Sequence, residues 1–130
     1  MINRTLFVLV LAVVVFAGVL PKPIPQLFSY FDLALHVGAF VVLGALGLLL
    51  PYAQKSRLHW IAGFTALLLI GIGIGIELWQ GWWLPARQAS LLDILADTAG
   101  VLVGAGIAFF MKQLRVLIKE ANEDADKIVS

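Results

Sequence analysis

Four long apolar stretches follow one another along this chain, and short polar segments separate them. A helix that crosses a bilayer needs roughly 17–25 apolar residues, so each stretch is predicted to form one membrane-spanning helix. Residues 71–75 alternate glycine and isoleucine as a strand would, but a helix is expected because lipid requires every backbone polar group to be bonded internally. The predicted spans cover about residues 5–20, 31–52, 58–79 and 91–111.

The two ends of the chain differ from the spans. The first stretch follows Arg4 as in a signal peptide, but its cleavage motif is poor, so we expect an uncleaved first helix. Residues 112–130 are polar, with apolar side chains on one helical face, which predicts a short amphipathic helix in solvent or at the interface rather than a partner site. We therefore expect an all-α integral membrane four-helix bundle over residues 1–111 and a cytoplasmic amphipathic tail over 112–130.

The distribution of cations predicts the orientation of the bundle. Lysine and arginine near the ends of spans favour the cytoplasmic side, and six of them fall on the side of both termini against two on the other. We therefore expect both termini to be cytoplasmic. The six are Arg4, Lys55, Arg57, Lys112, Arg115 and Lys119, and the two are Lys22 and Arg87.

Composition narrows the class of protein. The chain is 62% hydrophobic and 13% charged, whereas a soluble domain averages about 25% charged residues. The net charge is +1 and no basic patch is interleaved with aromatic residues, so we expect no nucleic-acid partner. The sequence has no cysteine, which excludes a disulfide framework, a thiolate metal site and a cysteine nucleophile.

Polar side chains gather at the predicted outer ends of the last three spans. Asp93 and Asp97 are one helical turn apart in an apolar segment, where insertion scales assign about 2.5–3.5 kcal/mol to a buried aspartate. Asp97 should lie about 9 Å below Leu91. We expect an outward pocket lined by the second, third and fourth spans. Its candidate ligand-binding residues are Asp32, His36, Glu77, Gln80, Arg87, Asp93 and Asp97.

Several of these residues also allow simpler roles. A lone histidine such as His36 is more often a packing residue than a ligand, Glu77 and Arg87 could form a structural ion pair, and Asp93 could cap the fourth helix. Asp97 is too deep to be a cap. Small residues at four-residue steps in the fourth span predict close helix packing, within the bundle or in a homodimer. They are Ala96, Gly100, Gly104 and Ala108.

An ordered series of polar residues resembles the pattern of the VanZ-like family of small bacterial membrane proteins. Its elements are a glutamate and a glutamine three residues apart, an arginine shortly after a proline, and an aspartate followed by a polar residue and a glycine. In this chain the series is Glu77, Gln80, Pro85, Arg87, Asp93, Asp97 and Gly100, with Asp32, His36 and Phe40 similar to the upstream part of the pattern.

The resemblance covers about residues 28–106, with two departures. Asp97 stands where the family usually has asparagine, and Leu33 stands where a lysine is common. The resemblance implies a multi-pass protein of the bacterial cytoplasmic (inner) membrane that acts in the cell envelope. It also suggests a link to the glycopeptide (teicoplanin) resistance associated with the family's namesake.

The first functional hypothesis is binding of an anionic lipid-linked envelope precursor, such as a polyprenyl phosphate. Arg87 can bind a phosphate through two hydrogen bonds. Glu77, Asp93 and Asp97 offer the oxygen ligands that Mg²⁺ or Ca²⁺ prefers. A cation held there would bridge the protein to a pyrophosphate, and tryptophans at the rim would pack on the lipid or a sugar.

Two other classes of function stay open. A buried carboxylate or His36 could act as general acid or base in a membrane hydrolase or transferase of lipid-linked phosphates. A small ion-coupled transporter would also have intramembrane carboxylates, but it needs a site that is reachable from both sides. The gathering of acids at one face counts against transport.

Overall fold

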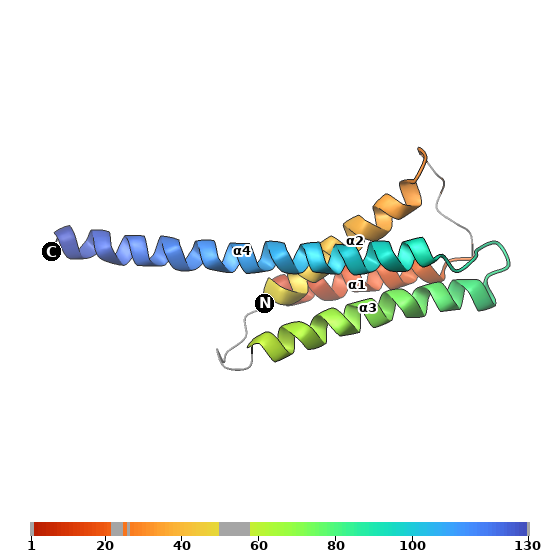
Figure 1. The fold of residues 1–130 in the computed structure, drawn as a ribbon, viewed down its shortest axis with the longest axis horizontal. Helices are drawn as coiled ribbons and strands as arrows, with labels where there is room; N and C mark the ends of the chain where they lie inside the picture. Colours follow the sequence, from red (N-terminus) through yellow and green to blue (C-terminus); the bar gives the residue numbers. More distant parts are fainter. Residues whose placement is uncertain (1, 22–24, 26, 50–57, 130) are drawn as a thin grey trace.

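All regular secondary structure in the described part of the chain is helical. The computed structural model describes residues 2–21, 25, 27–49 and 58–129, and the helices run antiparallel to their neighbours in sequence, so that both termini lie toward the same end of the bundle (Figure 1). The predicted all-α fold is confirmed. The helices are α1 (Ile2–Val19), α2 (Phe31–Leu49), α3 (Leu58–Trp83) and α4 (Leu91–Val129).

Three of these helices are long and apolar enough to cross a membrane, which makes this a multi-pass membrane protein. They are Phe31–Leu49, Trp60–Trp83 and Leu91–Lys127, while Arg4–Val19 is a shorter apolar helix. The 24 residues of Trp60–Trp83 span about 36 Å at 1.5 Å per residue, somewhat more than a hydrocarbon core of about 30 Å.

The predicted orientation of the termini rests partly on residues outside the described ranges. Lys22, Lys55 and Arg57 fall there, as do residues 50–52 of the predicted second span. The cytoplasmic placement of both termini therefore stays a prediction.

Two helices extend beyond their predicted ends. α3 continues four residues past the predicted end and stops at Trp83, just before Leu84 and Pro85, because a residue that precedes proline is disfavoured in the α conformation. α4 continues through the predicted tail as one helix of 39 residues. The predicted C-terminal helix is therefore the last part of α4 and not a separate element.

Glycines bring α2 and α4 into backbone contact. A Cβ on Gly100 would lie 2.7 Å from the Val37 carbonyl oxygen, and a Cβ on Gly44 would lie 2.8 Å from that of Val101. The predicted small-residue row is buried, and it packs within the bundle against α2. The central cluster of buried side chains consists of Phe40, Leu43, Leu69 and Val101.

Candidate functional site

The centre of the site is a hydrogen bond between α2 and α4. His36 lies in the second turn of α2 and Asp97 in the second turn of α4, and His36 Nδ1 is 2.8 Å from Asp97 Oδ1. The Asp97 side chain is 2% exposed. Gly100, one turn further along α4, permits the close approach of the two helices that this bond requires. The two residues are 61 apart in sequence.

A second buried carboxylate lies on the other side of the imidazole. Glu77 of α3 is fully buried, and its Oε1 lies 3.9 Å from His36 Nε2. Its Oε2 accepts a 2.8 Å hydrogen bond from the backbone N–H of Ser90. Within the described residues, Glu77 Oε1 and Asp97 Oδ2 have no hydrogen-bond partner. One imidazole is therefore held between two buried carboxylates, each with an oxygen left available for a proton, an ion or a ligand.

Gly73 makes room for the Asp97 carboxylate against α3. A Cβ on Gly73 would lie 2.6 Å from Asp97 Oδ2 and 3.1 Å from Asp97 Cβ. Only glycine leaves this space, since a methyl group there would push the carboxylate away from His36. The alternation of glycine and isoleucine in α3 thus has a specific use at this one position.

Gln80 connects the site to α1, which sequence reasoning had left out. Gln80 is 4% exposed, and its Nε2 donates a 3.0 Å hydrogen bond to the backbone carbonyl of Gly18. The acceptor is a main-chain oxygen in an apolar helix, so no side-chain signal in the first stretch could have indicated it.

A pocket of about 230 Å³ opens beside the cluster. Its walls are mostly apolar, and its polar residues come from α2, α3 and the α3–α4 loop. The prediction that the second, third and fourth spans line the pocket is wrong in one respect, because α1 takes the place of α4. Neither Asp93 nor Asp97 is among the lining residues, and Asp97 is instead hydrogen-bonded to His36. The lining residues are Val13, Val14, Ala17, Gly18, Asp32, Leu35, His36, Ala39, Phe40, Ile76, Gln80 and Arg87.

Arg87 reaches the pocket from the loop between α3 and α4. Its side chain is half-buried, and its Nε has no hydrogen-bond partner. Among the described residues, Arg87 forms no ion pair with Glu77, which is bonded to Ser90 and faces His36 instead. The guanidinium therefore has no ion-pair partner among the described residues and is available to an anion in the pocket, whose lining it shares with Asp32.

Asp32 and Asp93 complete the cluster at its outer edge. One ligand atom from each, together with one from His36, lie within 4.8 Å of one another, and all three residues are half-buried. The N-cap of α4 is Ser90 and not Asp93, because Ser90 Oγ accepts the Asp93 N–H at 3.2 Å. The spacing of a serine three residues before an acid is a capping signal that the sequence does contain. A cation held by Glu77, Asp93 and Asp97 stays a prediction.

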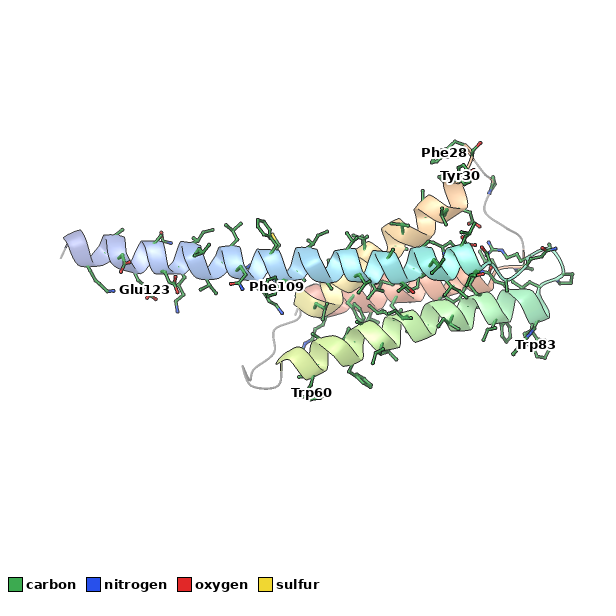
Figure 2. The ribbon with its side chains drawn as sticks, viewed as in Figure 1. Phe28, Tyr30, Trp60, Trp83, Phe109 and Glu123 are labelled. Atoms are coloured by element: carbon green, nitrogen blue, oxygen red, sulfur yellow. The ribbon has the colours of Figure 1, made fainter. Side chains whose placement is uncertain are left out.

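Tryptophans mark both ends of α3. Figure 2 shows Trp60 at one end of this helix and Trp83 at the end near the site, both projecting outward. Trp83 stacks on Trp79 with ring centroids 5.6 Å apart. Aromatic residues prefer membrane–water interfaces, so their positions agree with a helix that spans the bilayer and with a site close to one interface.

Comparison with known proteins identifies a family. A protein-family model described as VanZ/LLP1 matches residues 4–112, which include nearly all of α1, the whole of α2 and α3, the first part of α4 and every residue of the site. No curated protein and no solved structure matches the chain.

Proposed function

This chain belongs to the VanZ/LLP1 family. We propose that it binds the anionic headgroup of a lipid-linked envelope precursor at the end of the bundle that carries the α3–α4 loop, here called the loop end. The observation that carries the proposal is the pocket, which combines apolar walls with an arginine that forms no ion pair among the described residues. A guanidinium available beside apolar surface suits a ligand that joins a phosphate to a hydrocarbon chain. A polyprenyl phosphate or pyrophosphate has this chemistry.

The polar rim can bind a phosphate in several ways. Arg87 would donate two parallel hydrogen bonds to phosphate oxygens, and a hydrogen bond to a charged group contributes about 1.5–3 kcal/mol. His36 also lines the pocket and would donate a further hydrogen bond when its Nε2 carries a proton. Gln80 already donates to Gly18 and therefore contributes shape rather than a free donor.

The apolar walls would receive the first part of the hydrocarbon chain. Val13 of α1 lines the pocket and is 65% exposed, so the pocket reaches the outer surface of the bundle. In a bilayer this surface faces lipid, and a lipid ligand could enter sideways between α1 and α2. We place the protein in the bacterial cytoplasmic membrane, with the site at its outer face. A link to teicoplanin resistance is a further proposal that rests on the family alone.

A membrane hydrolase or transferase is the second candidate, and one observation favours it. The Asp97 carboxylate orients the His36 imidazole at the edge of the pocket, as in sites where a histidine acts as general base. Transport has less support, because the buried polar side chains of the described part, Glu77, Gln80 and Asp97, all lie at the loop end.

Native mass spectrometry of the purified protein with polyprenyl phosphate and pyrophosphate lipids, in the presence of Mg²⁺, tests the proposal. We expect a complex of unchanged lipid mass with the wild type. In Arg87→Ala the affinity should fall about 10- to 100-fold, because a loss of 1.4 kcal/mol corresponds to tenfold. Arg87→Lys keeps the charge but cannot form the paired hydrogen bonds, and it should bind with intermediate affinity.

The matched control is Arg115→Ala, which removes an exposed arginine from α4 outside the site and should bind like the wild type. Equal loss in both alanine variants would show a nonspecific effect of charge and would overturn the proposal. A lipid product of altered mass, formed by the wild type and not by His36→Gln, would establish the enzyme instead.

A further inference from the structure

We infer that Asp32, His36 and Asp93 form a binding site for a divalent transition-metal ion such as Mn²⁺ or Zn²⁺. Their ligand atoms lie within 4.8 Å of one another. Atoms that bind one ion at about 2.1 Å are at most about 4.2 Å apart, so small rotations of the two half-buried aspartates bring the set to bonding distance. The site does not depend on the headgroup proposal, because it is argued from these side chains alone.

The hydrogen bond from His36 to Asp97 prepares the imidazole for this role. The Nδ1 atom of His36 is hydrogen-bonded to Asp97 Oδ1 at 2.8 Å. Nε2 is therefore the nitrogen that can bind an ion. A histidine that binds a metal generally donates its other ring N–H to a carboxylate or carbonyl, which fixes the tautomer and the ring orientation. Asp97 is therefore a positioning residue and not one of the ligands.

A second observation points to a ligand at the same nitrogen. Glu77 Oε1 is fully buried, lies 3.9 Å from His36 Nε2 and has no hydrogen-bond partner in the part of the chain that the structure describes. This separation is too long for a hydrogen bond. It is close to the sum of a metal–nitrogen distance of about 2.0–2.1 Å and a metal–oxygen distance of about 2.0–2.2 Å, so one ion fits between the two atoms along a bent path. Glu77 can thus supply a fourth ligand.

The donor set also indicates the kind of metal. Mg²⁺ and Ca²⁺ prefer oxygen ligands alone, whereas imidazole favours ions such as zinc over them. The ligands of this site therefore differ from the metal ligands expected from the sequence. Asp32 and His36 are added, and Asp97 orients the imidazole instead of binding the ion. Asp32 and His36 also line the pocket, so an open coordination position would face any bound molecule.

Electron paramagnetic resonance with Mn²⁺ as the probe tests the assignment. The protein is purified in detergent, treated with a chelator and titrated with Mn²⁺ in the absence of any lipid headgroup ligand. Loss of the signal of free Mn²⁺ gives affinity and stoichiometry, and electron spin-echo modulation detects a coordinated ¹⁴N. We expect one bound ion per protein with a single ¹⁴N coupling from imidazole.

The variants separate the ligands from the positioning residue. His36→Gln should lose the ¹⁴N coupling, and Asp32→Asn and Asp93→Asn should each weaken binding at least tenfold. Asp97→Leu should weaken binding about 10- to 100-fold, as for other outer-shell partners, and keep the ¹⁴N coupling. Asp124→Asn, which changes an exposed acid of the distant part of α4, is the control and should bind like the wild type.

Three results would overturn the assignment. They are wild-type binding weaker than about 1 mM, which is the limit of weak extracellular sites, bound Mn²⁺ without a ¹⁴N coupling, or equal binding by all variants. The wild-type coupling decides the question even where a variant fails to fold. Because no lipid ligand is present, failure here would leave the headgroup proposal standing.

Discussion

Replacement of Gly100 by alanine should both destabilise the bundle and disturb the site. Gly100 lies three residues after Asp97 on α4, and an added Cβ would come within 2.7 Å of the Val37 carbonyl oxygen and 2.9 Å of Phe40 Cβ. The nearest obstacle is backbone and cannot rotate away. The first turns of α2 must therefore move outward, and His36, the neighbour of Val37, must move with them.

The size of this destabilisation can be estimated by comparing Gly100 with Gly106, a second glycine of α4. An extra methyl group in a well-packed interior costs about 1–3 kcal/mol, while alanine gains up to about 1 kcal/mol over glycine in helix propensity. Gly106→Ala receives the same gain without the clash, since nothing lies within 4 Å of its added Cβ. The difference between the two variants therefore isolates the packing effect, and we expect Gly100→Ala to be about 1–3 kcal/mol less stable than Gly106→Ala.

Unfolding in mixed detergent–SDS micelles, followed by helical circular dichroism and by tryptophan fluorescence, measures this difference. The same preparations can be tested for lipid binding by native mass spectrometry, where Gly100→Ala should bind more weakly and Gly106→Ala should match the wild type. Equal unfolding free energies for the two variants would refute the close contact of α2 with α4. A destabilised variant with undiminished lipid binding would refute the coupling of that contact to the site.

Three more substitutions test individual contacts. Gly73→Ala places a methyl group 2.6 Å from Asp97 Oδ2. It should destabilise the protein by about 1.5–3 kcal/mol, which is the contribution of a charge-assisted hydrogen bond such as that from His36 to Asp97. The control is Gly75→Ala, whose added methyl group meets nothing within 4 Å and should be neutral or stabilising. Gln80→Leu leaves the Gly18 carbonyl without its donor and should lower the free energy of unfolding by about 1–3 kcal/mol in the same assay. The same change at an exposed glutamine of α4 is the control and should have no such effect. Asp97→Asn preserves the shape and one hydrogen bond to the imidazole and should fold and bind lipid, but Asp97→Leu leaves His36 Nδ1 without its partner and should lose about 1–3 kcal/mol; equal losses in both would contradict the importance of that bond.

The features of the structure that could be predicted are those that depend on the sequence pattern within a single helix. The apolar stretches predicted the helices, and the four-residue spacing from Ala96 to Ala108 predicted the buried face of α4. The spacing of Asp32 from His36 and of Asp93 from Asp97 placed each pair on one helical face. Antiparallel order then brought these faces to one end of the bundle.

The remaining parts depend on how each helix is rotated about its axis, which the sequence pattern does not determine. The sequence suggested Arg87 as an ion-pair partner of Glu77, but the structure places Glu77 against the Ser90 backbone and His36. α1 joins the pocket through apolar side chains and the main-chain oxygen of Gly18, neither of which differs from ordinary packing in the sequence. The continuous α4 also lacks a visible boundary, since no glycine or proline separates Met111 from the tail.

The aspartate at position 97 gives the site a property that asparagine would not give. An ionised carboxylate can only accept hydrogen bonds, whereas an asparagine amide can accept or donate. When Asp97 is ionised, His36 must place a proton on Nδ1 to keep its 2.8 Å bond to Asp97, and in the neutral imidazole Nε2 then carries the lone pair. Asparagine would stabilise either tautomer. Aspartate at this position thus selects the form of His36 that can bind a metal ion or accept a proton at Nε2, beside the buried oxygen of Glu77.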